Sequence, residues 1–199
     1  MRELSMHILD VLENSLAAGS TRVELIIVED LATDRLNITI RDNGRGMGVE
    51  QLARVFDPFY TTRRTRHVGL GLPLFKAAAQ RCAGDVTLDS ELGVGTILCA
   101  TFQHSHVDRA PLGDMTSTLV TFLLGGSCDL YYCHRVGDRE FAFDTAEFRA
   151  ELGEIALSHP DVRRWLRAFV AEGEESLVVD TLPIGDRNLR RGLSAGSGN

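Results

Sequence analysis

The sequence Asp42-Asn43-Gly44-Arg45-Gly46 follows directly on residues 36–41, a segment in which apolar and polar side chains alternate. This alternation predicts a half-buried β-strand. An acid at the end of a strand can accept a hydrogen bond from an amino group, and two glycines let the backbone pack closely against a flat ring. Asp42, Gly44 and Gly46 are therefore candidate binding residues. A turn without a ligand is the alternative, because Asp-Asn-Gly is common turn chemistry.

A helix is expected upstream, from about Leu4 to Ala18, because apolar residues recur there at helical spacing and Gly19 is placed to end it. Asp10 and Asn14 are four residues apart in this helix, so both side chains project from one face. The Asn carbonyl oxygen can ligate Mg²⁺, and a carboxylate one turn away can deprotonate an attacking hydroxyl or water. A solvated polar pair is the alternative for these two residues taken alone.

Two further glycine pairs follow along the chain, in Gly69-Leu70-Gly71 and in Gly93-Val94-Gly95-Thr96. The first pair opens a predicted helix, where free N–H groups and the positive end of the helix dipole bind phosphates. The loop before it is basic, and an arginine such as Arg63 can bind a phosphate through two N–H groups. The second pair enters a predicted strand at Thr96, and a plain hairpin is the alternative there.

Taken in this order, the elements resemble the ATPase domain shared by gyrase, the heat-shock chaperone, histidine kinases and mismatch-repair proteins, the GHKL-type ATPases. The resemblance covers about residues 4–103. Its later part looks like sensor histidine kinases with a short lid. The stretch from Leu12 to Asp42 resembles mismatch-repair ATPases as much as it resembles these kinases. The stretches that carry it are Leu12-Glu13-Asn14-Ser15-Leu16, Asp42-Asn43-Gly44-Arg45-Gly46-Met47, Phe56-Asp57-Pro58-Phe59-Tyr60-Thr61-Thr62-Arg63, Gly69-Leu70-Gly71-Leu72 and Gly93-Val94-Gly95-Thr96.

The resemblance implies the Bergerat-type ATP-binding fold, an α/β (α+β) two-layer sandwich with helices on one face of a mixed β-sheet. It also implies ATP and Mg²⁺ as cofactors. By position, Asn14 would ligate Mg²⁺, Asp10 would act as general base and Asp42 would accept from the adenine amino group. The remaining nucleotide-binding positions would be Gly44 and Gly46 at the base, Arg63, Gly69, Leu70 and Gly71 at the lid and phosphates, and Thr96 on the adenine side.

The sequence pattern changes after His104, which predicts three parts. Residues 1–103 would form the ATP-binding domain, residues 104–180 a small C-terminal α+β unit, and residues 181–199 a flexible tail rich in Gly and Ser.

Within the small unit, Asp114 is expected to cap a helix with Met115, Leu119, Phe122 and Leu123 on its apolar side. A hairpin is expected to turn at Gly137–Asp138, and a further helix to begin after Asp144. A last helix would carry its apolar side chains on one core-facing side: Val162, Trp165, Leu166, Phe169 and Val170.

Composition excludes several classes of protein. The 199 residues carry a net charge of −7, which disfavours non-specific nucleic-acid binding. The apolar runs are far shorter than a membrane span, and the N-terminus lacks the pattern of a secretory signal, so we expect a cytoplasmic protein. The four cysteines lack a CxxC pair, and Cys128 and Cys133 with His134 look like strand positions more than metal ligands.

The sequence thus predicts a stand-alone ATP-dependent phosphotransferase or ATPase that acts on a separate, unidentified protein. Sensor kinases carry their acceptor histidine on a helical hairpin ahead of the ATPase domain. Here the first family motif begins within ten residues of Met1, so we expect no such hairpin. His7 is expected to line or border the pocket and not to accept phosphate. The alternative function is a nucleotide-gated interaction switch, anti-sigma-like, with little turnover. The sequence leaves open whether the chain forms a homodimer.

Overall fold

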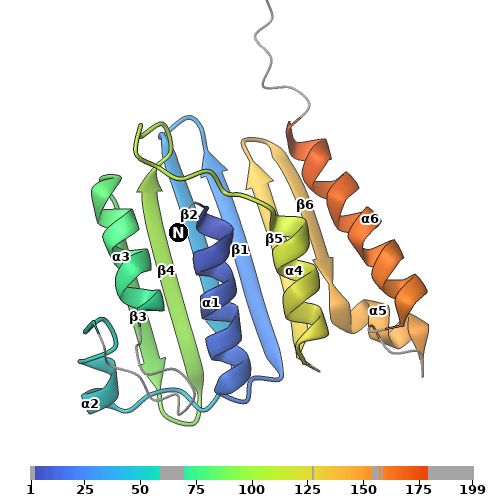
Figure 1. Ribbon diagram of the computed structural model, residues 1–199, viewed down its shortest axis with the longest axis horizontal. Coiled ribbons are helices and arrows are strands. Elements are labelled where there is room, and N and C mark those ends of the chain that lie inside the picture. Colours follow the sequence, from blue (N-terminus) through green and yellow to red (C-terminus); the bar gives the residue numbers. More distant parts are fainter. Residues whose placement is uncertain (1–2, 59–69, 127, 154–156, 158, 179–199) are drawn as a thin grey trace, which may run out of the picture.

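A computed structural model describes residues 3–58, 70–126, 128–153, 157 and 159–178. The expected lid, residues 59–68, the expected hinge residue Gly69 and the expected tail lie outside the described residues. Within them, six strands form one mixed sheet in the order β3-β4-β2-β1-β5-β6 (Figure 1). The strands are β1 (Arg22–Asp30), β2 (Arg35–Asp42), β3 (Asp85–Glu91), β4 (Gly95–Gln103), β5 (Asp129–Val136) and β6 (Arg139–Asp144).

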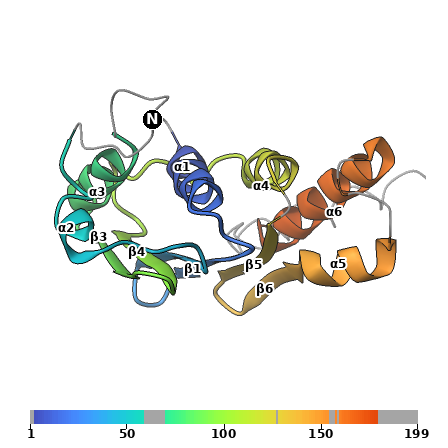
Figure 2. The same cartoon turned by 90° about the horizontal axis from the view of Figure 1, so that it is seen from below.

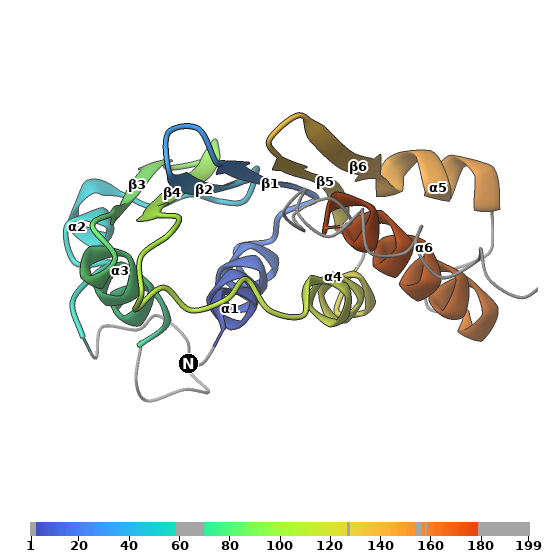
Figure 3. The ribbon, with the colours of Figure 1, turned by 90° about the horizontal axis from the view of Figure 1, so that it is seen from above.

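The helices give the molecule its second layer. Helices α1, α3, α4 and α6 lie over the same face of the sheet, while α5 extends beyond β6 and α2 lies beside β3 (Figures 2 and 3). The predicted α/β two-layer sandwich is therefore confirmed. The helices are α1 (Leu4–Ala17), α2 (Val49–Leu52), α3 (Gly71–Arg81), α4 (Met115–Leu124), α5 (Thr145–Leu152) and α6 (Pro160–Val178).

Helix α1 lies in the middle of the helix layer, between α3 and α4 (Figure 2). Its apolar stripe of Leu4, Ile8 and Leu12 is fully buried against the sheet, as the helical spacing predicts. The linker that precedes α4 supplies acceptors for the first turn of α1. Its carbonyl oxygens at Pro111 and Leu112 accept from the first two backbone N–H groups of the helix, which have no partner inside it.

Strands β5 and β6 extend the sheet instead of forming a separate one. β5 runs parallel to β1 and pairs with it along its whole length, with Val23 opposite Leu130. β6 folds back on β5 through the predicted turn at Gly137, whose φ of +57° suits glycine. The sheet is thus continuous across residue 103, and the domain boundary stays a prediction.

The predicted helix starts in the C-terminal part are confirmed, with one correction in α6. Asp114 accepts from the N–H of Ser117 at the start of α4, and Asp144 accepts from the N–H of Ala146 at the start of α5. On the apolar face of α6, Val162, Leu166 and Val170 are buried and Phe169 is partly buried, whereas Trp165 is 47% exposed. The ring stacks on Phe169 at a centroid distance of 5.3 Å, so the aromatic contact holds it at the rim of the core instead of inside.

A chain of ionisable side chains lies under α6, where β1 ends. Glu29 of β1 is 3.1 Å from Nε2 of His134 and also contacts Nε2 of His104. Nδ1 of His134 is 2.9 Å from Glu174 of α6, whose other oxygen accepts from the Tyr132 hydroxyl at 2.8 Å. A carboxylate oxygen therefore lies at each ring nitrogen of His134. Only the protonated imidazolium can donate to both.

The charges in this chain support one another. Burial lowers the pKa of His134, but its hydrogen bonds to Glu174 and Glu29 outweigh burial and raise the pKa to about 9. Burial raises the pKa of Glu29, but the hydrogen bonds from His134 and His104 lower it to about 2. At neutral pH the imidazolium lies between two carboxylates and ties α6 to the sheet.

These hydrogen-bonded ionisable side chains predict a pH-dependent contribution to stability. Because the pKa of His134 is raised on folding, its contribution is complete below the unfolded value of about 6.5 and is lost as pH rises through about 9. Glu29 contributes above about 4.5, and its contribution is lost as pH falls toward 2. His134→Gln should lower the free energy of unfolding by about 3 kcal/mol at pH 6 and by much less at pH 10.

Denaturant unfolding of wild type and variant across this pH range would measure the difference. His159→Gln, which changes a histidine that is half exposed, serves as the control and should be neutral throughout. A His134→Gln deficit of the same size at pH 6 and pH 10 would contradict the imidazolium assignment.

Candidate functional site

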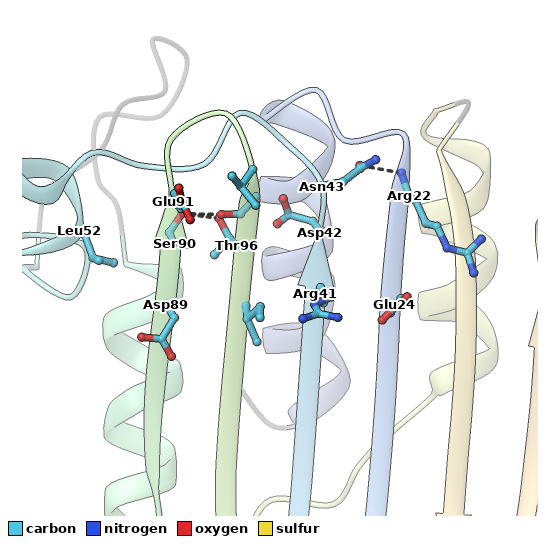
Figure 4. A pocket seen from close by; sticks show the side chains of 13 residues that line it. Arg22, Glu24, Arg41, Asp42, Asn43, Leu52, Asp89, Ser90, Glu91 and Thr96 are labelled. Atoms are coloured by element: carbon cyan, nitrogen blue, oxygen red, sulfur yellow. Dashed lines mark hydrogen bonds between the residues drawn. The ribbon is translucent and has the colours of Figure 1, made fainter.

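The carboxylate of Asp42 lies where β2 ends, on the helix side of the sheet, and three donors hold it. Ser15 of α1 donates to Oδ2 at 2.9 Å. Oδ1 accepts from the Ser20 hydroxyl at 3.2 Å and from the N–H of Gly44 at 2.8 Å. The last turn of α1, the turn after it and the glycine loop therefore converge on one acid. Figure 4 shows this carboxylate beside Thr96 of β4, the residue that pairs with Asp42 across the strands.

The glycine loop packs against the β3–β4 hairpin at close range. Gly46 has a φ of +63°, and a Cβ there would collide with the carbonyl of Glu91. The N–H of Met47 donates to the Ser90 hydroxyl, which lies 2.9 Å from the hydroxyl of Thr96. Gly93 and Gly95 lie in the β3–β4 hairpin, which packs against the glycine loop beside Asp42. The binding role of Thr96 stays a prediction.

Asp10 and Asn14 lie on α1 as the spacing predicts, on the side that faces α3. A Cβ added to Gly71, the first residue of α3, would lie 3.4 Å from the Asp10 carboxylate. Leu70 immediately precedes this helix as its N-cap. Asn14 is exposed and adjoins Ser15, so it lies next to the Asp42 cluster. Arg63 and Gly69 are outside the described residues.

The residues present fit a nucleotide with Mg²⁺. Gly44 lets the loop approach the end of α1 closely, since a Cβ there would lie 2.7 Å from the Ser20 hydroxyl oxygen and 2.8 Å from the Ala18 side chain. Asn14 offers a carbonyl oxygen, a donor of the hard type that Mg²⁺ prefers, and the Asp10 carboxylate lies one turn away on the same helix. The part of the chain that the structure describes has no cluster of three acidic, His or Cys metal ligands.

Comparison with known proteins agrees with this geometry. Residues 2–106, more than half of the 199-residue chain, match the family of histidine kinase-, DNA gyrase B-, and HSP90-like ATPases. The chain belongs to this ATPase family. The resemblance inferred from the glycine motifs is therefore confirmed.

Relatives in this ATPase family include several sensor proteins. A putative sensor protein of Shewanella frigidimarina is 30% identical over 54% of this chain, and the heme sensor protein HssS of Staphylococcus saprophyticus is 37% identical over 41%. A probable C4-dicarboxylate sensor kinase of Halalkalibacterium halodurans is 34% identical over 44%. The chain spans 17% of the length of each of these relatives.

Among solved structures, the N-terminal domain of a DNA repair protein aligns with a TM-score of 0.48 at 12% identity, covering 71% of this chain and 52% of that one.

In the described part of the chain, no helix has the length and apolar character that crossing a membrane requires.

His7, one turn before Asp10, is unsuited to accept phosphate in this arrangement. It is buried, and its ring stacks on Phe75 of α3 at 5.0 Å with an interplanar angle of 9°. Burial lowers its pKa to about 4, so the ring is neutral at physiological pH. Its Nδ1 has no hydrogen-bond partner among the described residues. It packs between α1 and α3, so it borders the site from inside the core.

A hollow of about 580 Å³ opens at the same end of the sheet. Asp42 and Thr96 form part of its wall, but Arg22, Glu24 and Arg41 line it from the face of the sheet that the helices leave uncovered (Figure 4). The hydrogen-bonded Asp42 cluster, which lies on the helix face, is therefore the better guide to the ATPase site.

Sequence patterns did not identify the serines that complete the site. Ser15, Ser20 and Ser90 are hydrogen-bonded into it, yet each belongs to a common residue type in an ordinary context. Only Ser15 carried a signal, because it is a polar residue on the apolar stripe of α1 and is 2% exposed. A buried hydroxyl in such a stripe needs a partner from outside the helix.

The close approach at Gly95 predicts a selective effect of substitution. Its φ is +141°, and a Cβ there would collide with the Asp42 carbonyl, so Gly95→Ala should destabilise the fold by about 3 kcal/mol or more. Gly93 has a φ of +80° and no atom within 4 Å of where a methyl group would lie, so Gly93→Ala should cost about 1 kcal/mol from backbone strain alone. Denaturant unfolding would measure both. Equal losses would refute the contact with Asp42.

Proposed function

We propose that this chain binds Mg²⁺-ATP and transfers the γ-phosphate to a separate protein, or to water. The observation that carries the proposal is the Asp42 carboxylate, fixed by three donors beside the helix face that presents Asp10 and Asn14. A carboxylate in this position can accept from the amino group of adenine, and glycines let the backbone of the loop pack closely against a flat base.

The proposed chemistry requires one proton transfer to the protein. Asp10 accepts the proton of the attacking hydroxyl or water while the oxygen of that nucleophile forms a bond to the γ-phosphorus, and ADP leaves with the electrons of the broken P–O bond. Bound Mg²⁺ would neutralise phosphate charge, and Asn14 would help to hold it. The N-terminus of α3 at Gly71, beside Asp10, would face the phosphates with its free N–H groups.

A second candidate function is a nucleotide-gated interaction switch, and one set of contacts favours it. Asn43, next to Asp42, accepts from the N–H groups of Thr21 and Arg22 at 2.9 and 3.0 Å. Arg22 then pairs with Asp144 through two hydrogen bonds, the shorter 2.7 Å, and Asp144 caps α5. If nucleotide binding orders the glycine loop, these contacts can transmit the change from Asn43 to the C-terminal helices.

Nucleotide binding should depend on Asp42. Asp42→Asn should weaken ATP binding by about 1.5–3 kcal/mol, because it removes the charge from a charge-assisted hydrogen bond. GTP should bind poorly to the wild type, since guanine presents a carbonyl where adenine has its amino group. Calorimetric titration in the presence of Mg²⁺ would test both. Equal affinities for ATP and GTP would contradict the assignment of Asp42.

Turnover should depend on Asp10 in a different way from binding. Asp10→Asn keeps the shape but removes the proton acceptor, so phosphate release or transfer should fall by roughly 10²–10⁴ while ATP affinity changes little. Asn14→Ala should instead reduce Mg²⁺-dependent binding. Glu13→Gln, which removes a carboxylate from the same helix, should leave turnover within about twofold.

Labelled ATP separates the two functions. With γ-labelled ATP and lysate from the source cell, label in protein or in free phosphate supports the enzyme. Tight binding with neither product, together with wild-type behaviour of Asp10→Asn, would favour the switch.

A further inference from the structure

The hydrogen bonds of Asp42 leave its two oxygens unequal. Oδ1 accepts from Ser20 and from the Gly44 N–H, whereas Oδ2 accepts from Ser15 among the described residues. A carboxylate oxygen has room for about two hydrogen bonds. Oδ1 is therefore filled, and the remaining acceptor position lies on Oδ2, the oxygen that Ser15 holds.

Ser15 has one proton and two acceptors within reach. Its hydroxyl oxygen is 2.9 Å from Oδ2 of Asp42 and 3.3 Å from the carbonyl of Val11 in its own helix. The bond to the ionised acid is shorter and charge-assisted, so the proton belongs there. Ser15 is 2% exposed, and buried apolar neighbours on α1 hold the helix in place, so this donor is rigid.

The three donors differ in what they attach Asp42 to. Ser20 and Gly44 lie in the turn after α1 and in the glycine loop, both of which adjoin the end of β2. Ser15 belongs to the helix layer, and its neighbour in the chain is Asn14. Its bond therefore sets the angle of the carboxylate relative to the helix that carries the proposed metal ligand and base.

We propose that Ser15 is a positioning residue for nucleobase selection: its hydroxyl fixes the Asp42 carboxylate so that the open position of Oδ2 points at the amino group of the base. This inference rests on the proposed function and adds a specificity determinant to the same site. Without Ser15, the carboxylate can turn about its Oδ1 contacts, and its bond to the amino group loses its fixed geometry.

The test compares ATP with purine riboside triphosphate, which lacks only the amino group of adenine. The ratio of their dissociation constants isolates the bond between Asp42 and that amino group. In the wild-type chain with Mg²⁺, this ratio should be about 10–100, the range for a charge-assisted hydrogen bond. In Ser15→Ala it should fall below about 3. Ser20→Ala should lower it by less than twofold, because the Gly44 N–H still holds Oδ1.

Ser15→Thr keeps a hydroxyl at the same place and should keep the ratio within about threefold of the wild type. A ratio that falls in Ser15→Ala and keeps its wild-type value in Ser15→Thr supports the inference. A preserved ratio in Ser15→Ala, with both nucleotides weakened equally, would show a merely structural role and overturn it. A ratio that falls in both variants would overturn it too. Ser15→Thr keeps the hydroxyl, so the fall would then have a cause other than loss of that group.

The proposed function fails separately from the inference. A wild-type chain that binds neither nucleotide would overturn both. A wild type that prefers ATP, with a Ser15→Ala variant that prefers it as strongly, would overturn the role of Ser15 alone.

Discussion

The burial of α1 against the middle of the sheet is the constraint on which the rest of this structure depends. Leu4, Ile8 and Leu12 are fully buried there, and each such side chain contributes about 1.5–3 kcal/mol when it leaves water. This stripe fixes the rotation of the helix about its axis. The same rotation turns Asp10 toward α3 and brings Ser15 onto the acid at the end of β2.

The two ends of the helix layer hold different kinds of polar contact. At the end where we propose that the nucleotide binds, the Asp42 cluster ties α1 and the glycine loop to β2. Among the described residues it leaves one acceptor position of the carboxylate open, which suits a ligand. At the other end, His134 lies between Glu29 and Glu174 with both ring nitrogens used, which suits a permanent attachment of α6. The first arrangement supports binding, and the second supports the architecture around it.

The C-terminal strands join the last helices to the same sheet that carries Asp42. Because β5 pairs with β1 along its whole length, the last helices are attached to the strand that begins beside the glycine loop. The contacts from Asn43 through Arg22 to Asp144 follow this path in the backbone and side chains. A physical link of this kind is compatible with an enzyme and with a switch, and only differential contacts in the two nucleotide states separate them.

The sequence by itself determined the family through the resemblance of its motifs, and that resemblance implied the two-layer class. Helical and strand periodicity placed Asp10 and Asn14 on one helix and Asp42 at the end of a strand, because periodicity is a local property. The sequence also located the caps at the starts of α4 and α5. Tertiary structure alone decided that β5 joins β1, since strand pairing depends on contacts distant in the chain. It likewise placed Trp165 at the rim and gave Ser15 its partner, because a side chain's burial and hydrogen bonds depend on what packs against it.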